Sequence, residues 1–379
     1  MKTKTLAVDD RPHLIKPNGE RTVPWLESLR DQDAIGEEAA EWAAKREYLA
    51  FLRSKQAIDA PTGFDIDRKS IMLQLFQFQA DITAWAIRRG RAGIFADCGL
   101  GKTPMQLEWA RHVSRHIGKP VLIFAPLAVS RQTEREGQKF GVCVTVCATQ
   151  ADVQPGVNIT NYEKLAHFPD ASQFGGVVLD ESSILKGMDG KTRKALTEWC
   201  RTIPFRLCCT ATPAPNDYME LGNHAEFLGV MTCIEMLAMF FTHDGGDTSK
   251  WRIKGHAEDV FWKWVASWAV AIRKPSDLGY EDDGFALPPI EMHQITVSAE
   301  QTPGYLFPVE GNTLQERNQA RRDSITDRVE ACAGIVNASD EFWTVWCNLN
   351  SESDALDAAI EDALEVQGSD TTEFKEKAA

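Results

Sequence analysis

Short apolar runs recur along the first two thirds of the chain, with stretches of helical periodicity between them. The runs lie at 92–95, 121–125, 142–146, 158–160, 177–179 and 206–210. Strands that are apolar on both faces and are separated by helices are typical of a parallel sheet covered by helices on both sides. The pattern therefore predicts an α/β fold built on a parallel sheet.

The segments before the first run carry weaker signals. Three prolines interrupt any period over residues 1–35, which predicts a loosely ordered start. Residues 36–54 show an amphipathic helical pattern, and residues 71–90 show another that leads into the first strand.

Residues 218–272 have a helical, aromatic-rich pattern. Five apolar residues fall on one face at helical spacing: Phe261, Trp264, Val265, Trp268 and Ile272. Such a stripe is typical of a core or domain contact rather than of a ligand site.

The pattern changes after residue 275. Residues 276–289 form a linker rich in Gly, Pro and acidic residues, and a charged helix is predicted at about 315–335. Residues 342–348 are predicted to be the first strand of a second α/β unit, 353–365 its helix, and Val366 the start of another short strand.

Composition limits the class of protein. The chain has 379 residues, enough for two domains, with 43% hydrophobic and 25% charged residues as in soluble globular proteins. We expect no membrane partner, because no apolar run approaches the ~18–20 residues of a membrane span, and no secretory signal follows Met1. Nine cysteines without a CxxC pair disfavour a zinc site or a disulfide framework, so a reducing cytosol is expected.

The net charge of −14 has the wrong sign for a protein that coats nucleic acid. A local basic track would still suffice, because phosphate contacts need only a few well-placed Lys and Arg residues. The candidates are Arg88, Arg89, Arg91, Arg111, Arg115, Arg131 and Arg135. These arginines fit solvated helix ends equally well.

Residues 95–103 (FADCGLGKT) lie between an apolar strand and a helical pattern. Gly99 and Gly101 allow backbone N–H groups to approach a triphosphate, and the following helix N-terminus adds a positive dipole end. Lys102 can reach the β- and γ-phosphates, and the Thr103 hydroxyl can ligate Mg²⁺. The segment predicts a nucleotide-binding loop.

A nucleotide-binding loop needs a magnesium carboxylate and a group that orients the attacking water. The apolar strand at 177–179 is followed by Asp180 and Glu181, which places both acids at the carboxyl edge of the sheet. We predict that Asp180 holds Mg²⁺ and that Glu181 polarises water. Acids that merely cap a strand end are the alternative.

Two further signals depend on their order along the chain. Thr210 and Thr212 follow the next strand and could sense the γ-phosphate, although hydroxyls at a strand tip are ordinary turn formers. Gln79, upstream of Lys102, has the two-sided amide geometry that reads an adenine edge, with an aromatic neighbour to stack. A lone Gln on an amphipathic helix would otherwise be a solvated surface residue.

In this order the motifs resemble those of the superfamily-two (DEAD/DEAH-like) helicases and translocases, most closely the Swi/Snf-like branch of phage and prophage genes. The matching segments are 97–103 (Walker A, preceded by Ala96 in place of Gly), 125–129 with Gln132, 160–163, 180–183 (Walker B) and 210–216. Residues 273–274 and 287–289 resemble the crossing to a second lobe. The resemblance spans about residues 71–379.

The resemblance implies a RecA-like fold, Mg²⁺ and ATP as cofactors, and DNA as partner. Nucleotide binding is assigned to Gln79, Gly99, Gly101, Lys102 and Thr103. Catalysis is assigned to Lys102, Asp180 and Glu181, and Mg²⁺ binding to Thr103 and Asp180. Coupling is assigned to Ser183, Thr210 and Thr212, and nucleic-acid contact to Pro126, Arg131, Thr160 and Asn161.

The implied organisation has four parts. They are an N-terminal extension (1–70), a RecA-like ATP-binding lobe (71–285) with a helical insertion at about 217–275, a linker and connecting helix (286–335), and the start of a second, incomplete RecA-like lobe (336–379). The family's arginine finger and last two motifs would lie further on. We therefore expect Mg·ATP binding with poor hydrolysis unless a second polypeptide completes the lobe.

Ser183 stands where the family usually has His or Asp, which affects the coupling of hydrolysis to movement. Two other functions remain open. One is a P-loop ATPase that acts on a protein partner, and the other is a non-hydrolysing nucleotide-binding subunit.

Overall fold

The computed structural model describes residues 59–379, apart from 73, 128, 187–189, 245–246, 287, 298–312, 372–373, 376–377 and 379. The helix expected over 36–54 and most of the extension 1–70 lie outside the described residues. The chain divides after Ala286 into two compact units, which are described separately.

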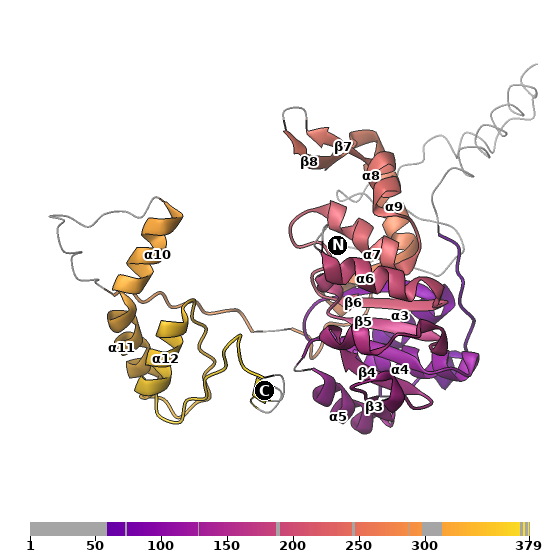
Figure 1. Ribbon diagram of the computed structural model, residues 1–379. Coiled ribbons are helices and arrows are strands. Elements are labelled where there is room, and N and C mark those ends of the chain that lie inside the picture. Colours follow the sequence, from indigo (N-terminus) through magenta and orange to yellow (C-terminus); the bar gives the residue numbers. More distant parts are fainter. Residues whose placement is uncertain are drawn as a thin grey trace, which may run out of the picture. The chain divides into compact units, whose positions relative to one another are not determined.

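The first unit is built on a seven-stranded sheet with the order β3-β4-β2-β5-β6-β1-β9, in which every described pairing is parallel. The strands are β1 (Arg91–Ala96), β2 (Val121–Ala125), β3 (Val144–Val146), β4 (Val157–Asn161), β5 (Gly176–Asp180), β6 (Phe205–Thr210) and β9 (Ala269–Ile272). The sheet and its flanking helices (Figure 1) confirm the predicted α/β, RecA-like arrangement.

The helices of this unit alternate with the strands along the chain, beginning with α3 before β1. They are α3 (Gln77–Arg89), α4 (Lys102–Ile117), α5 (Ser130–Phe140), α6 (Lys191–Trp199), α7 (Leu221–Leu228), α8 (Cys233–Phe240) and α9 (Glu258–Trp268). The first of them begins at Gln77, later than the predicted start at residue 71.

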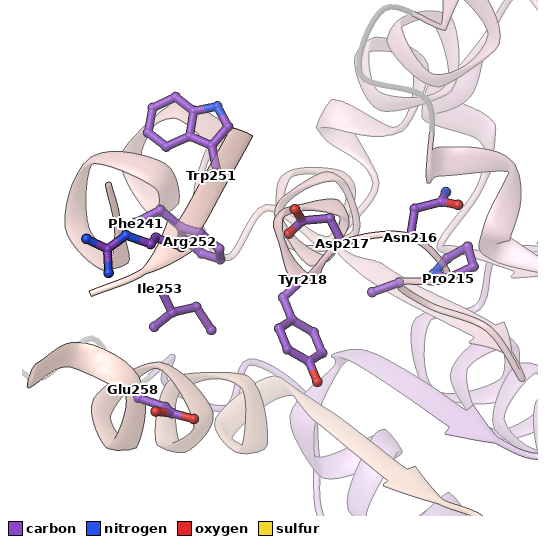
Figure 2. A pocket seen from close by; sticks show the side chains of 10 residues that line it. Pro215, Asn216, Asp217, Tyr218, Phe241, Trp251, Arg252, Ile253 and Glu258 are labelled. Atoms are coloured by element: carbon purple, nitrogen blue, oxygen red, sulfur yellow. The ribbon is translucent and has the colours of Figure 1, made fainter. Parts of the chain in front are cut away.

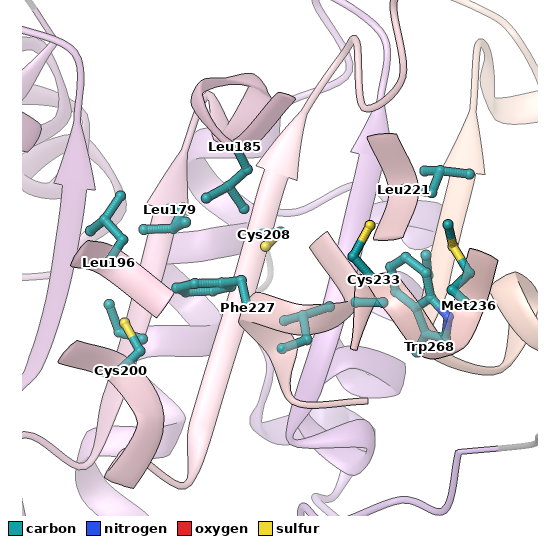
Figure 3. Close-up of a cluster of buried hydrophobic side chains, with 14 of the residues drawn as sticks. Leu179, Leu185, Leu196, Cys200, Cys208, Leu221, Phe227, Cys233, Met236 and Trp268 are labelled. Atoms are coloured by element: carbon teal, nitrogen blue, oxygen red, sulfur yellow. The ribbon is translucent and has the colours of Figure 1, made fainter. Parts of the chain in front are cut away.

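The core has two layers because alternate strand residues point to opposite faces of the sheet. Val178 packs with α3 and α4 in one cluster. Its neighbour Leu179 packs in the other cluster, with α6, α7 and α9. Figure 3 shows part of this second cluster, where Phe227 of α7 and Leu196 of α6 lie over the strand side chains. The sheet is therefore covered on both faces, as its apolar strands predict.

The segment predicted as a helical insertion, 217–275, contains two strand features that the pattern missed. Strands β7 (Phe241–Asp244) and β8 (Asp247–Ile253) form an antiparallel hairpin. The helix ends at Trp268, and residues 269–272 pair with β1 as the last strand of the main sheet. Ile272 is buried as part of that strand and does not extend the helical stripe. The prediction failed here because a run of four apolar residues fits the period of a helix and that of a buried strand equally well. The rest of the stripe is buried core, as predicted.

The buried Glu108 ties α4 to the segment before α3. Its Oε1 accepts from the Met72 backbone N–H at 2.9 Å, and its carboxylate accepts two hydrogen bonds from Arg111 at 2.6 and 2.7 Å. Burial raises the pKa of Glu108, but hydrogen bonds from His112, Arg111 and Met72 outweigh it and hold the pKa at about 2. This carboxylate fixes the helix whose first residues carry the predicted phosphate contacts.

We expect Glu108→Gln to destabilise the protein at pH 7 by roughly 2 kcal/mol, or roughly 5 °C in Tm, because it breaks a buried ion pair. The folded-state pKa of about 2 lies below the ordinary 4.5, so the stabilisation is complete above pH 4.5 and is lost as pH falls towards 2. Thermal unfolding at pH 7 and at pH 3 measures this, with the exposed Glu281→Gln as control. An equal Tm deficit at both pH values would contradict it.

The second unit contains α10 (Leu314–Asp323), α11 (Ile325–Val336) and α12 (Asn350–Ala359) among its described residues. The predicted charged helix is therefore divided at Ser324. Arg328 of α11 pairs with Glu352 of α12. Val329 and Leu356 are buried on the same two helices.

The strands predicted at 342–348 and at Val366 are wrong, since the structure assigns no strand to either segment. Phe342 and Trp346 are fully or almost fully exposed. A β-branched and aromatic run favours a strand only where a neighbouring strand can pair with it.

Among the described helices of both units, none is long and apolar enough to cross a bilayer.

Candidate active site at the carboxyl edge of the sheet

The predicted phosphate loop joins the end of β1 to the start of α4. Gly99 has φ 79° and Gly101 has φ 75°, a left-handed conformation that favours glycine. A Cβ added at Gly101 would lie 2.3 Å from Nε2 of Gln79, whereas one at Gly99 would meet nothing within 4 Å. The loop is thus packed on one side and open at Gly99.

Lys102 is the first residue of α4 and is half-buried. Its Nζ donates to the backbone oxygen of Ala96 at 2.8 Å and to that of Asp97 at 3.2 Å. The ammonium therefore lies over the loop, at the positive end of the helix dipole. Thr103 follows on the first turn.

Asp180 ends β5 and is separated from β1 by β6 alone. It pairs in register with Cys209, which in turn pairs with Ile94 near the end of β1. Burial is the main cause that raises the pKa of Asp180 to about 6, and the charge of Glu181 also raises it. The ammonium of Lys102 lowers the same pKa, so the structure brings these two side chains within range of electrostatic interaction.

The carboxylate of Glu181 is held by the residues predicted to couple it to the next strand. Its Oε1 accepts from Thr210 Oγ1 at 2.6 Å and from Ser183 Oγ at 2.8 Å. Thr210 Oγ1 also accepts from the Thr212 backbone N–H at 3.1 Å. The structure thus joins Ser183, Glu181, Thr210 and Thr212 in one hydrogen-bonded network.

The residues at this edge fit Mg·ATP. The open side of Gly99 and the helix N-terminus at Lys102 offer backbone N–H groups to phosphate. A hydroxyl from Thr103 and a carboxylate from Asp180 are oxygen donors of the kind that Mg²⁺ prefers. No group of three or more His, Cys, Asp or Glu residues able to hold a metal occurs among the described residues.

Gln79 lies beside the loop but does not present a free amide. Its side chain is buried, its Nε2 donates to the Leu100 backbone oxygen at 3.0 Å, and its Oε1 accepts from the Phe76 backbone N–H at 3.0 Å. In this structure Gln79 supports the loop, and its contact with adenine stays a prediction. Phe76, 56% exposed, is the aromatic neighbour that could stack on a base.

The predicted nucleic-acid residues divide into two pairs. Pro126 is partly exposed and Arg131 of α5 is exposed. Thr160 and Asn161 are buried, with Thr160 Oγ1 donating to the Cys147 backbone oxygen at 2.8 Å and Asn161 Oδ1 accepting from Ser130 Oγ at 2.5 Å. Neither buried side chain is available to a polymer here, so surface contact would fall to the first pair.

The wider basic track is largely used in internal contacts. Arg88 pairs with Asp65, Arg89 with Asp59, and Arg111 with Glu108. Arg91 Nε donates to the Pro204 backbone oxygen at the opposite, amino edge of the sheet. Arg115 is exposed, but it lies in the last turn of α4, at the far end of that helix from Lys102. Arg131 and Arg135 on α5 remain as an exposed basic pair.

Several residues around the site were given no role from the sequence, although Tyr162 lies within the matched segment 160–163. Gln106, fully buried on α4, lies close enough to Asp180 to lower its pKa, although neither amide atom completes a hydrogen bond. Tyr162 Oη donates to the Asp180 backbone oxygen at 2.7 Å. His224 contacts Ser182, next to Glu181. Helical position relative to the motif could have indicated Gln106, but the other two contacts depend on the fold.

A separate pocket of about 630 Å³ opens beyond the strand-tip threonines. Figure 2 shows Tyr218 pointing into it and facing Ile253 of the β7–β8 hairpin, with Asp217 and Glu258 at its margins. None of the predicted site residues lines it, so it is distinct from the candidate active site.

No protein-family model matches the chain, and no curated protein matches it. Solved structures with similarity include the Sulfolobus solfataricus SWI2/SNF2 ATPase core in complex with dsDNA, 20% identical with a TM-score of 0.46 over 56% of this chain and 47% of that one. The SWI2/SNF2 ATPase core domain of the same organism gives 20% identity and a TM-score of 0.42 over 56% and 48%. The UvsW helicase of bacteriophage T4 gives 13% and 0.36 over 54% and 69%. The chain spans about half the length of the Sulfolobus cores.

Proposed function

We propose that this chain is the ATP-binding lobe of an ATP-dependent DNA helicase or translocase. The observation that carries the proposal is the network at Glu181, whose carboxylate is bonded to Thr210 while Asp180 and Lys102 interact beside it. Phosphoryl transfer to water needs a ligand for the metal and a group that orients the water, and these two acids would supply them.

The roles follow from the position of each group. Lys102 would neutralise phosphate oxygens from the N-terminus of α4, and the first backbone N–H groups of that helix would cradle them. Mg²⁺, held by Thr103 and Asp180, would supply charge compensation on the phosphate oxygens. Glu181 would orient the attacking water as general base.

The link from Glu181 to Thr210 supplies a route for coupling. Thr210 ends β6 and begins the segment that runs through Thr212. A change at the carboxylate would alter a hydrogen bond that also positions this segment. Ser183 holds the same carboxylate oxygen, so a hydroxyl takes the place that the resembled family gives to His or Asp.

DNA is proposed as the polymer because Arg131 and Arg135 form an exposed basic pair on α5, the helix that follows the partly exposed Pro126 in the chain. Phosphate contacts by Lys and Arg dominate such binding and weaken as salt rises. Internal pairing of the other arginines and the net charge of −14 favour the second candidate, a P-loop ATPase that acts on a protein partner.

Turnover of ATP with and without duplex DNA tests the proposal and separates the candidates. We expect Mg²⁺-dependent ATP turnover that is weak for the chain alone and that duplex DNA raises severalfold once a second polypeptide completes the lobe, with a stimulation that declines from 50 to 200 mM salt, roughly the range over which phosphate contacts weaken. Arg131→Ala combined with Arg135→Ala should reduce the stimulation and leave basal turnover unchanged. Turnover that DNA never stimulates would favour the protein-partner alternative, and nucleotide binding without turnover would favour a non-hydrolysing subunit.

A further inference from the structure

The turn that follows Glu181 is held from a helix that no motif marks. Ser182 and His224 are both fully buried, and the His224 Nε2 lies 3.2 Å from Ser182 Oγ. The other ring nitrogen, Nδ1, lies 3.4 Å from the Glu220 backbone oxygen. Because a carbonyl oxygen only accepts, Nδ1 carries the proton, and Nε2 accepts from the Ser182 hydroxyl. Burial lowers the pKa of His224 to about 4, in keeping with a neutral ring.

The neighbouring residue of α7 holds the far end of the same turn. Asn223 Nδ2 donates to the Leu185 backbone oxygen at 2.9 Å and to the Lys186 backbone oxygen at 3.2 Å. The consecutive side chains of Asn223 and His224 thus form hydrogen bonds with opposite ends of the turn Ser182–Lys186.

The backbone at Glu181 needs such support. Its φ is 54°, in the left-handed region that non-glycine residues seldom adopt. A residue held there costs about 1–3 kcal/mol and persists only when its surroundings fix it. Tyr162 holds the residue before it through the Asp180 backbone oxygen, and His224 holds the residue after it through Ser182.

The same imidazole also touches the strand that leads to the phosphate loop. The rings of Phe95 and His224 meet edge to face with centroids 5.3 Å apart. Glu220, one turn earlier, accepts from Asn216 Nδ2 at 2.8 Å and so holds the segment that follows the strand-tip threonines. The start of α7 is in contact with all three segments that carry the candidate chemistry.

We propose that His224 is a positioning residue for Glu181, acting through the Ser182 hydroxyl to fix the direction of the carboxylate that orients water. This inference rests on the proposed ATP hydrolysis, but the geometry it describes is present whether or not hydrolysis occurs. Without the His224 contact the turn would sample other conformations, and a misplacement of about 1 Å at a catalytic group costs up to roughly 100-fold in rate.

The test compares four single variants and the double variant that combines His224→Leu with Ser182→Ala. His224→Leu removes both ring hydrogen bonds, and His224→Gln keeps an oxygen that can accept from Ser182. Ser182→Ala removes the hydroxyl alone. Glu226→Gln is the matched control, since Glu226 lies on the same helix and pairs with Arg193 at 2.7 Å, away from the turn. The full chain is used throughout.

Two readouts are needed. The first is steady-state kinetics, which gives kcat and KM for ATP, and the second is hydrogen exchange of the peptide that covers 178–186. We expect His224→Leu to lower kcat by roughly 10- to 100-fold with little change in KM, and to speed exchange at 181–186 while a peptide covering β2 is unchanged. His224→Gln should recover most of the rate. Ser182→Ala should lower kcat and speed exchange as much as His224→Leu does. The double variant should lower kcat no more than either single variant.

Each outcome either supports or overturns the positioning role of His224. Unchanged exchange at 181–186 in His224→Leu overturns the inference, as does an additive double variant or a Glu226→Gln loss of the same size. If wild type shows no turnover beyond that of Lys102→Ala, hydrolysis is refuted, and the exchange data alone then support or overturn the positioning by His224.

Discussion

Replacing Lys102 with alanine is expected to lower the rate of ATP turnover by about 10²–10³-fold. This is the usual effect of losing one preorganised donor at a charged transition state. The ammonium lies at the start of α4 within 2.8 Å of the Ala96 oxygen, at the point where phosphate would meet the helix N-terminus. Nucleotide affinity should fall as well, by ~10-fold or more, because hydrogen bonds to charged groups contribute about 1.5–3 kcal/mol. Steady-state turnover and equilibrium titration with a fluorescent ATP analogue measure the two effects.

The fold should survive this change, since the Lys102 side chain is only half-buried and bonds to two loop carbonyls. Lys194→Ala is the matched control, because Lys194 is an exposed lysine of α6 and lies outside the phosphate loop. Circular dichroism and Tm confirm that each variant is folded. Unchanged nucleotide affinity in a folded Lys102→Ala protein would contradict the proposed site.

The second large effect is expected for Glu181→Gln. The amide oxygen of glutamine can still accept hydrogen bonds from Thr210 and Ser183, so the network keeps its shape. The variant loses only the charge and basicity that orient and deprotonate water. We therefore expect turnover to fall by about 10²–10⁴-fold, the usual contribution of a general base, with Mg·ATP affinity close to wild type.

This separation of binding from turnover distinguishes a general base from a structural acid. Glu198→Gln, an exposed change on α6, provides the control. If Glu181→Gln weakens Mg·ATP binding as much as Lys102→Ala does, Glu181 acts in binding and the water-orienting role is wrong. Full turnover in Glu181→Gln would also exclude that role.

Much of the sheet could be predicted because its strands are apolar on both faces. The runs at 121–125 and 206–210 lie in β2 and β6. Where a run lacked a clear period, prediction failed. Residues 269–272 continue a helical stripe in sequence yet form β9, since an open sheet edge beside β1 was available to them. Residues 342–348 have strand composition but no strand partner, and they stay unpaired.

The candidate site was predictable to the extent that its groups follow strand ends. Lys102 and Asp180 converge because parallel strands bring their carboxyl ends to one edge. The surroundings of each side chain were not predictable. Thr160 and Asn161 are buried, and Gln79 braces the loop. Backbone groups satisfy the side chains of Gln79 and Thr160, and the Ser130 hydroxyl donates to Asn161.

His224 shows most clearly what could not be predicted from the sequence. It lies 42 residues from Ser182 in sequence, and no spacing rule connects them. Only the packing of α7 on this face of the sheet brings the ring to the turn. Positioning contacts of this kind come from tertiary structure and leave no local pattern in the sequence.

The central claim is that an ammonium, a hydroxyl and two acids from distant segments surround one metal–nucleotide complex. A crystal structure of the full chain with Mg²⁺ and a non-hydrolysable ATP analogue tests it most directly. We expect the triphosphate on the N-terminus of α4, with Mg²⁺ bound by Thr103 and Asp180 and the γ-phosphate facing Glu181. A nucleotide bound elsewhere, or none at saturating concentration, would contradict it.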